Sequence, residues 1–289
     1  MKILLLGGKG MLGSDLVEAC QRRAWEAIPL DLPEIDITQE AGLAEALPAC
    51  DAVINCAAFT RVDDAEKERE LCWRINADGA GQVGRACATR GFPLIHLSTD
   101  YVFNGRKGTP YFESDPVEPL NYYGLSKLEG ETQVRAAGGR AVVVRTQSLF
   151  GLRGRSFIRA ILNQLQQGKT SLRVVADQVS SPTYTPHLAD ALLRLVEVHP
   201  GSGIVNVAAR GQCSWWAFAQ TIAARVKPGI AIQRLSTAEL NFPALRPAFS
   251  VLDTARYTAL AGVPMPPWEA GLEAYLAADP VAQSLRPAG

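Results

Sequence analysis

The sequence predicts an α/β protein with a doubly wound parallel sheet and a smaller mixed α/β portion after it. Three observations support this prediction. The chain opens on a continuous apolar run, residues 3–6, that ends at glycines, as expected of a central strand buried on both faces. Short apolar runs then alternate with helical patterns up to residue 144, which is typical of βαβ units. After about residue 150 the strand patterns weaken while helical patterns continue.

The first turn has the glycine spacing of a dinucleotide-binding loop. Gly8, Gly10 and Gly13 fit G-x-G-x-x-G, and Gly7, Gly10 and Gly13 fit the looser G-x-x-G-x-x-G. A helical face follows at once, made of Met11, Leu12, Leu16, Val17 and Cys20. Glycines here let backbone amides reach a pyrophosphate at the positive end of the helix. We therefore expect a Rossmann-like dinucleotide site; the alternative is a glycine-rich turn without a ligand.

Asp31 lies where a carboxylate would bind the adenosine ribose of such a cofactor. It stands 18 residues after Gly13, at the end of the apolar run 27–30, and an acid there accepts hydrogen bonds from ribose hydroxyls. Its charge would repel a 2′-phosphate and favour NADH, whereas Lys9 would partly neutralise that phosphate. The residues therefore leave NADH and NADPH both open.

The other elements of the first half follow in alternation. Strands are predicted at 27–30, 52–54, 94–97 and 141–144, and helices at 64–90 and 123–135. Small residues, Cys56, Ala57 and Ala58, come after the strand 52–54, at the carboxyl end where such sheets bind ligands. They leave room for a cofactor, although tight packing of strand against helix would use the same residues.

A long loop and a second helical half complete the chain. Residues 104–110, followed by Pro116 and Pro119, predict an irregular excursion of the kind that lines sites. Helices are predicted at 156–167, 187–198, 215–226 and 267–277, and the tail 282–289 is expected to fray. We predict a dinucleotide-binding domain over residues 1–148. Residues 149–289 would be mainly substrate-binding, with some segments returning to the first domain.

Tyr123 and Lys127 form a Tyr-x-x-x-Lys pair on a predicted helix. Positions i and i+4 share a helix face, so the ammonium can favour the phenolate and lower the tyrosine pKa from its reference of about 10. Such a pair alone is typical of exposed helices. Here residues 97–101, LSTDY, place hydroxyls at the carboxyl end of a strand, where catalytic groups of such sheets lie. The combination indicates an acid or base that works near neutral pH.

Composition argues against several classes of protein. Of 289 residues, 47% are hydrophobic and 20% charged, and 29 basic residues balance 29 acidic ones. This balance gives no support for nucleic acid or an anionic membrane as partner. Without a long apolar run or a signal pattern, we expect a cytoplasmic protein. Six cysteines without C-x-x-C, and three histidines without matching spacing, predict reduced thiols and no structural metal. No interface stripe stands out, which leaves a homodimer open.

Two strings carry a family resemblance. Residues 98–103 read STDYVF, and residues 123–131 read YGLSKLEGE. Together with the glycine-rich turn they resemble the extended short-chain dehydrogenase/reductases, most closely those that reduce the 4-keto group of dTDP-4-dehydro-L-rhamnose. The similarity continues at 177–183, 188–190 and 246–247, so it covers nearly the whole chain. It implies a nucleotide-sugar substrate and NADPH or NADH as cofactor.

The resemblance also assigns roles. Thr99 is similar to the hydroxyl that hydrogen-bonds the substrate carbonyl, Tyr123 to the acid that protonates it, and Lys127 to the residue that tunes the tyrosine and holds the nicotinamide ribose. Two placed donors and one proton suffice for a hydride transfer that forms an alkoxide. The expected cofactor-binding residues are Gly7, Gly10, Met11, Leu12, Gly13, Asp31, Asp36, Ile37, Cys56, Ala57, Ala58, Tyr123 and Lys127. The expected substrate-binding residues are Thr99, Asp100, Tyr101, Ser148 and Arg246.

One departure from the family lies in the sugar pocket. The family's usual string after the fifth strand is RTSWVYG, whereas residues 145–151 read RTQSLFG. Ser148 therefore stands where a tryptophan usually packs the deoxysugar, and the sugar subsite is expected to be wider unless another residue such as Phe150 or Trp215 fills the space. Specificity depends on such contacts, so the departure bears on the sugar and leaves the hydride chemistry unchanged.

Two other functions share this fold. A non-catalytic regulatory subunit would bind the dinucleotide only, and the intact Thr99, Tyr123 and Lys127 argue against it. A nucleotide-sugar epimerase or dehydratase would share the same three residues. Dehydratases usually carry an added acid and base pair beside the hydroxyl. Asp100 supplies an acid here, but Tyr101 follows it, where their pattern has glutamate.

Overall fold

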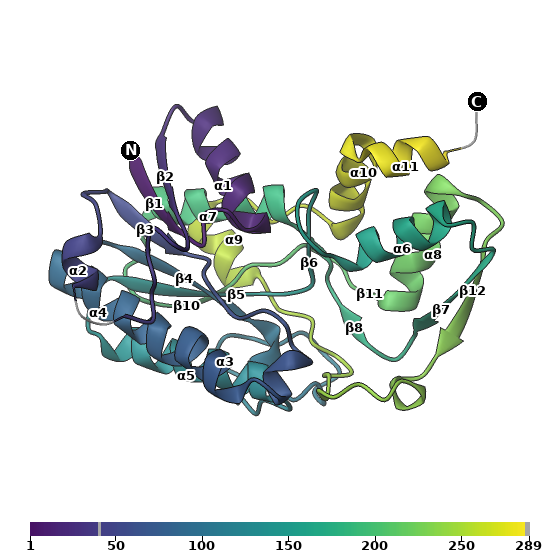
Figure 1. Ribbon diagram of the computed structural model, residues 1–289, viewed down its shortest axis with the longest axis horizontal. Helices are drawn as coiled ribbons and strands as arrows, with labels where there is room; N and C mark the ends of the chain where they lie inside the picture. The colour runs from purple at the N-terminus through teal and green to yellow at the C-terminus, as the bar shows by residue number, and fades with distance from the viewer. Residues whose placement is uncertain (40–41, 287–289) are drawn as a thin grey trace.

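The computed structural model describes residues 1–39 and 42–286, which form two lobes (Figure 1). The larger, called the sheet lobe, holds a six-stranded sheet in the order β10-β5-β4-β3-β1-β2. Its strands are β1 (Lys2–Leu6), β2 (Glu26–Leu30), β3 (Ala52–Asn55), β4 (Leu94–Thr99), β5 (Ala141–Thr146) and β10 (Gly203–Asn206). Every pairing in it is parallel. The predicted doubly wound α/β fold is confirmed.

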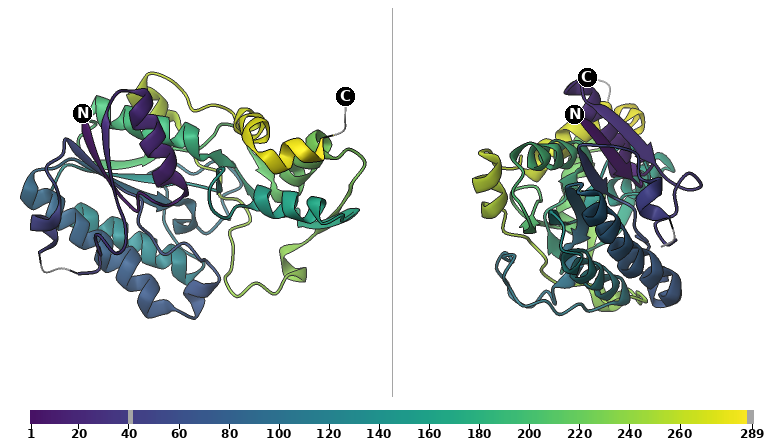
Figure 2. Two further views of the ribbon diagram at one scale, coloured as in Figure 1. Left: turned by 45° about the horizontal axis from the view of Figure 1, so that its top comes forward. Right: turned by 90° about the vertical axis from the view of Figure 1, so that its left-hand side faces the viewer.

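Helices cover both faces of this sheet (Figure 2). One face carries α1 (Met11–Arg22), α7 (Thr185–Val198) and α9 (Ala255–Ala261), and the other α2 (Leu43–Ala46), α4 (Ala80–Arg90) and α5 (Tyr122–Ala136). Strand β1 shows why helices pack on both faces, because successive side chains of a strand point to opposite faces of the sheet. Ile3 and Leu5 pack with α1 and α7, whereas Leu4 and Leu6 pack with α2 and α4. An uninterrupted apolar run is therefore what a strand covered on both faces needs.

The predicted helix over 64–90 is interrupted. It begins with the 3-10 helix η1 (Asp64–Glu66) and α3 (Arg69–Trp73), and a π-helical turn, η2 (Arg74–Gly79), precedes α4. The reason lies at Asn76 inside η2. Its side chain accepts from the Phe59 amide (2.8 Å) and donates to the Phe59 carbonyl (3.0 Å) and the Ser126 hydroxyl (3.0 Å). The π turn thus places the Asn76 side-chain amide where it hydrogen-bonds the backbone of the loop at Phe59 and a hydroxyl of α5.

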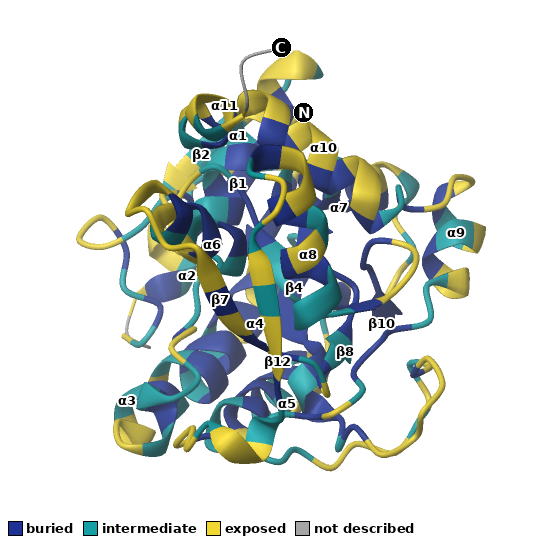
Figure 3. Ribbon diagram, turned by 90° about the vertical axis from the view of Figure 1, so that its right-hand side faces the viewer, coloured by how far each residue is buried: buried dark blue, intermediate teal, exposed yellow. Residues whose placement is uncertain are grey.

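The other lobe, called the small lobe, has an aromatic core and a short parallel strand pair. The pair is β7 (Ser171–Val175) with β12 (Ala231–Leu235), and its outer residues are exposed (Figure 3). Its helices are α6 (Phe157–Gln166), α8 (Trp215–Val226), α10 (Trp268–Ala278) and α11 (Pro280–Leu285). Two-residue strands pair as β6 (Leu149–Phe150) with β9 (Thr183–Tyr184), and as β8 (Val179–Ser180) with β11 (Cys213–Ser214). Phe150, Phe218, Trp268 and Tyr275 gather in the core.

The chain crosses between the lobes more than once. Elements α7, β10 and α9 follow residue 148 in sequence, yet they pack in the sheet lobe. The division at residue 148 therefore remains a prediction about function. The irregular segment predicted after residue 104 runs on to the start of α5, with η3 (Asp100–Val102) before it. A short 3-10 helix, η4 (Thr237–Glu239), follows β12.

The end of the chain differs from expectation. Residues 280–285 form α11, because the Asp279 carboxylate caps its first amides at 2.9 and 3.0 Å. The prediction of a frayed tail is wrong for this helix, and residues 287–289 lie outside the described residues. In the described part, no helix is both long and apolar enough to span a membrane.

Candidate functional site

A cavity of about 840 Å³ opens at the carboxyl ends of β1, β3, β4 and β5, between the two lobes. It brings together nearly all of the residues predicted from the sequence. Those that line it are Gly7, Gly10, Met11, Leu12, Gly13, Asp31, Asp36, Ile37, Cys56, Ala57, Ala58, Thr99, Asp100, Tyr101, Tyr123, Lys127 and Ser148. Among the predicted residues, Arg246 does not line it. The cavity lies where ligands bind in doubly wound sheets.

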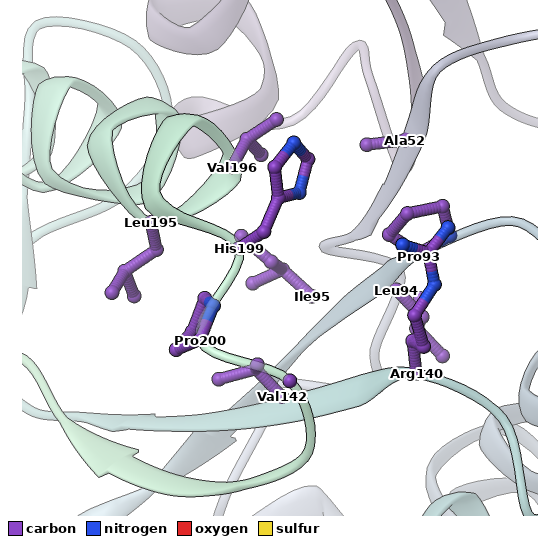
Figure 4. Close-up of a pocket in the computed structure, with 11 residues that line it drawn as sticks. Ala52, Pro93, Leu94, Ile95, Arg140, Val142, Leu195, Val196, His199 and Pro200 are labelled. Atoms are coloured by element: carbon purple, nitrogen blue, oxygen red, sulfur yellow. The ribbon is translucent and has the colours of Figure 1, made fainter. Parts of the chain in front are cut away.

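The opposite edge of the sheet offers much less space. A cavity of about 50 Å³ lies there between Pro93, Arg140 and the end of α7 at His199 (Figure 4). Its other walls are mostly aliphatic, including Ile95, Val142 and Leu195. It is too small for a nucleotide, because ligand sites usually enclose at least about 300 Å³.

The glycine turn leaves an open cradle for phosphate. Gly7 has a φ of +73°, and a Cβ there would lie 2.7 Å from the Ala57 amide nitrogen. A Cβ on Gly13 would clash with the Gly7 carbonyl oxygen, so turn, strand and helix meet at contact distance. Gly10 is the N-cap of α1, and no described side chain caps that helix. Its first amides are therefore free for an anion, which fits a dinucleotide pyrophosphate.

The two acids predicted to bind the cofactor are held by backbone amides. Asp31 accepts from the amides of Lys9 (3.3 Å) and Leu32 (3.0 Å). The Lys9 ammonium lies 2.6 Å from Glu34, so its charge already has a carboxylate partner. Asp36 accepts from the amide and hydroxyl of Thr38, which lowers the pKa of its carboxyl. The arrangement suits ribose hydroxyls better than a 2′-phosphate.

Asp31→Ala is expected to weaken NADH binding more than NADPH binding. The carboxylate that accepts from ribose hydroxyls and repels a phosphate would be gone, and the preference should shift toward NADPH by about 1–2 kcal/mol. Direct binding titrations with each cofactor measure this. Asp51→Ala is the matched control, because Asp51 is exposed and accepts from the Lys2 amide far from the cavity. Equal weakening of both cofactors would mean that Asp31 is only part of the fold.

The proton-transfer groups come from β4 and α5. Thr99 ends β4, while Tyr123 and Lys127 lie one turn apart near the start of α5. Asn121 fixes that start, because its side chain accepts from the Gly124 amide at 2.8 Å. The Tyr123 ring meets the edge of Tyr101, with centroids 5.9 Å apart. Neighbouring rings thus hold the predicted acid beside the predicted carbonyl donor.

The expectation that Lys127 lowers the pKa of Tyr123 is not met. Desolvation raises the pKa of Tyr123 above its usual value, the Asp100 charge adds to this, and a hydrogen bond with Thr99 opposes it. The Lys127 ammonium donates instead to the Leu97 carbonyl at 2.6 Å. Burial lowers the pKa of Lys127 to about 8, with Glu131 acting against the shift. Tyr123 is therefore neutral near pH 7, which is the form that can give up a proton.

A buried ion pair lies beneath these groups. The Arg145 guanidinium donates to both Glu131 oxygens, at 2.9 and 2.7 Å, and the Ser98 hydroxyl donates to Oε1 at 2.5 Å. The side chains of the two charged residues are only 3% and 2% exposed. Glu131 is one helical turn beyond Lys127, so the pair supports the face of α5 that lines the cavity.

One wall of the cavity contains two residues that the sequence analysis missed, Thr146 and Gln147. Ser148, with a φ of +47°, bonds the Ser180 hydroxyl at 2.8 Å. Thr146 and Gln147 also line the cavity beside it, and their place at the end of β5 was a usable signal. Trp215 lines the same wall from α8 and packs on Phe157, at a centroid distance of 4.7 Å. The small lobe therefore brings one aromatic ring to the wall of the cavity.

Arg246 lies behind the cavity wall. Its guanidinium binds both oxygens of Asp63, at 3.0 and 2.8 Å, and stacks over the Phe242 ring. It also forms a hydrogen bond with Tyr101 that lowers the pKa of that phenol, against a larger effect of burial. The geometry suits a residue that supports Tyr101, and direct contact of Arg246 with substrate stays a prediction.

Comparison with known proteins gives a consistent result. The model of the family described as RmlD substrate binding domain matches residues 1–280. The spore coat polysaccharide biosynthesis protein SpsK of Bacillus subtilis is 37% identical over 277 residues, 95% of this chain and 96% of that protein. The dTDP-4-dehydrorhamnose reductase of Mycobacterium tuberculosis H37Rv is 38% identical over 286 residues, 96% and 93% of the two chains. The crystal structure of dTDP-4-dehydrorhamnose reductase from Bacillus anthracis with NADP superposes with a TM-score of 0.91 at 34% identity, covering 96% and 98%.

Proposed function

Because the chain belongs to the RmlD substrate binding domain family, we propose that it reduces the 4-keto group of dTDP-4-dehydro-L-rhamnose to give dTDP-L-rhamnose. It is an oxidoreductase that uses NADPH or NADH, and its substrate is a nucleotide sugar. The observation that carries the proposal is one cavity that joins an uncapped glycine cradle to Thr99, Tyr123 and Lys127. These are the parts that a carbonyl reduction needs.

The residues of the chain have separate tasks in this proposal. When bound, the cofactor supplies a hydride from C4 of its nicotinamide ring. Thr99 donates a hydrogen bond to the keto oxygen, and Tyr123 protonates the alkoxide that forms there. Lys127, whose ammonium donates to the Leu97 carbonyl, would hold the nicotinamide ribose. The phenol of Tyr123 carries its proton at neutral pH, so it is in the form that can donate to the alkoxide.

Turnover with a panel of substrates tests this function. Loss of NADPH or NADH absorbance is followed with nucleotide-activated 4-keto sugars, among them dTDP-4-dehydro-L-rhamnose, and turnover of that substrate is expected. Cofactor binding without turnover of any keto sugar would favour a regulatory subunit. Release of water from a 4-keto precursor would favour a dehydratase.

The proposal extends to location and partners. Biosynthetic relatives support a cytoplasmic enzyme that acts on small molecules, and the balanced charge supports a protein without nucleic acid or membrane partners. A homodimer is the remaining prediction. Light scattering on the protein as it elutes from a size-exclusion column would give the mass of the assembly, which for a homodimer is twice that of one chain.

Ser148→Trp is expected to raise kcat/KM for dTDP-4-dehydro-L-rhamnose. The gain in transition-state stabilisation should be about 1–3 kcal/mol at most, the range of an apolar pocket contact. An added ring would cover the deoxysugar, whose subsite is wider and wetter with serine. Ser148 has a positive φ, which a bulky side chain tolerates less well than serine does, so this range is an upper limit. Kinetics on wild type and variant measure the effect.

Ser148→Ala is the control, because it removes the bond to Ser180 without adding a ring. No gain is expected from it. Tight and selective turnover by the wild type would instead show that Trp215 has already rebuilt the pocket.

A further inference from the structure

The carboxyl of Asp100 lies directly against the predicted carbonyl donor. Asp100 follows Thr99 where β4 passes into η3, lines the cavity, and is 2% exposed. The Thr99 hydroxyl is 3.0 Å from Asp100 Oδ1 and accepts from the Tyr101 amide at 3.2 Å. The Tyr123 phenol is a further hydrogen-bond partner of this hydroxyl, and in the proposed reaction it donates to the keto oxygen instead. Three polar groups, which are the Asp100 carboxyl, the Tyr101 amide and the substrate carbonyl, then share the Thr99 hydroxyl.

The Thr99 hydroxyl has only one proton, so it cannot donate to both an ionised Asp100 and the keto oxygen of the substrate. It carries one proton and two lone pairs, and the Tyr101 amide occupies one lone pair. An ionised Asp100 would take the proton, and Thr99 would then turn a lone pair toward the keto oxygen. A protonated Asp100 would donate to the second lone pair, so that the proton of Thr99 is free for the keto oxygen. Only the protonated acid is compatible with the role proposed for Thr99.

The charges around Asp100 also favour its protonated form. The groups that face Asp100 are Tyr123 from α5, Tyr101 from η3, Thr99 from β4 and Ser250 from the segment after η4. None of these four is a cation. Nearby cations of the described chain have other partners: Lys127 lies on Leu97 and Arg246 on Asp63. A carboxylate at this site would also repel the alkoxide that forms beside Thr99, and a neutral acid would not.

On the premise of the reductase activity proposed above, we propose that Asp100 is a positioning residue: its protonated carboxyl donates to Thr99 and directs the single Thr99 proton to the substrate carbonyl. Burial supports this by raising the pKa of Asp100 to about 7, while hydrogen bonds from Ser250 and Thr99 oppose the shift. The acid is therefore largely protonated at slightly acidic pH. It loses its proton within the range in which the enzyme can be assayed.

The pH dependence of turnover follows from this arrangement. Below about pH 7 Asp100 is protonated and Thr99 donates to the substrate. Above it, kcat/KM falls by about tenfold per pH unit, the slope of a single titrating group. Lys127, with a pKa of about 8, adds a second fall at higher pH.

Asp100→Asn tests which of the two decreases in kcat/KM with pH comes from Asp100. The side-chain amide can donate to Thr99 at every pH, so the inflection near pH 7 should disappear and only the later one should remain. Asp253→Asn is the matched control, since Asp253 accepts from the Ala255 amide at the start of α9 and does not line the cavity, and it should keep the wild-type profile. An unchanged inflection in the Asp100 variant would overturn the proposal.

Two further measurements do not depend on the stability of that variant. Ser250→Ala removes a hydrogen bond that favours the ionised acid, so the first inflection should move to higher pH. An infrared titration of the ligand-free protein should show the C=O stretch of a protonated carboxyl, which disappears as pH rises through about 7. No such band at about pH 6, or a shift of the inflection to lower pH, would refute the role of Asp100. Because the infrared band needs no substrate, absence of turnover in the wild type would count against the reductase function alone.

Discussion

Tyr123→Phe is expected to lower kcat by about two orders of magnitude or more and to leave the Kd for NADPH nearly unchanged. The change removes the proton donor, and general acids typically contribute about 10²- to 10⁴-fold. The ring and its edge contact with Tyr101 would remain, so the walls of the cavity should keep their shape. Single-turnover kinetics and a cofactor titration measure the two quantities separately.

Two variants on the same helix define what this result means. Tyr122→Phe removes a neighbouring phenol that packs near Trp73 and does not line the cavity, and it should behave as wild type. Lys127→Met should lower kcat and also weaken NADPH binding, because it removes the charge expected beside the ribose. Wild-type turnover by Tyr123→Phe would remove Tyr123 from the mechanism.

Glu131→Gln is expected to lower the free energy of unfolding by about 3–5 kcal/mol, because it leaves the buried Arg145 charge without its carboxylate. This is a large part of the about 5–15 kcal/mol that stabilises a typical domain. The bidentate geometry and exposures of 2–3% make the pair sensitive to loss of one partner. Urea unfolding followed by circular dichroism gives the difference between variant and wild type.

The exposed pair of Arg61 with Glu68 provides the comparison. Its atoms are 3.0 Å apart, but its side chains are 52% and 43% exposed, so Glu68→Gln should cost less than about 1 kcal/mol. The double change Glu131→Leu with Arg145→Met should recover much of the loss, since neither charge stays buried alone. A cost for Glu131→Gln as small as that at Glu68 would show that water reaches the buried pair.

The sequence predicted features that depend on neighbouring residues. The apolar run of β1, the spacing of Gly7, Gly10 and Gly13, and the small residues after β3 are local patterns, and their places in the sheet and the cavity agree with prediction. Uninterrupted apolar runs identify buried parallel strands because both faces of such strands are covered.

Features that depend on distant segments were not predictable in this way. Arg246 pairs with Asp63, which is 183 residues earlier, and no local pattern marks that contact. The break in the helix before α4 depends on a loop that needs the amide of Asn76. The direction of the Tyr123 pKa shift depends on burial by several elements, which outweighs the i, i+4 spacing with Lys127. The orientation of Lys127 toward Leu97 likewise becomes visible only in three dimensions.

The capping side chain at the start of α5 limits how this enzyme can be recombined with relatives. Asn121 caps the helix that carries Tyr123 and also donates to the Leu245 carbonyl at 2.7 Å. Leu245 lies in the segment 240–254 between η4 and α9, here called the strap. A chimaera that exchanges the small lobe keeps this bond only if residue 121 is an asparagine and the strap holds the carbonyl of residue 245 in the same place. The loss would misalign the helix start with no change to any residue in the cavity. Crossover points for lobe exchange should therefore keep residue 121 and the strap from one parent.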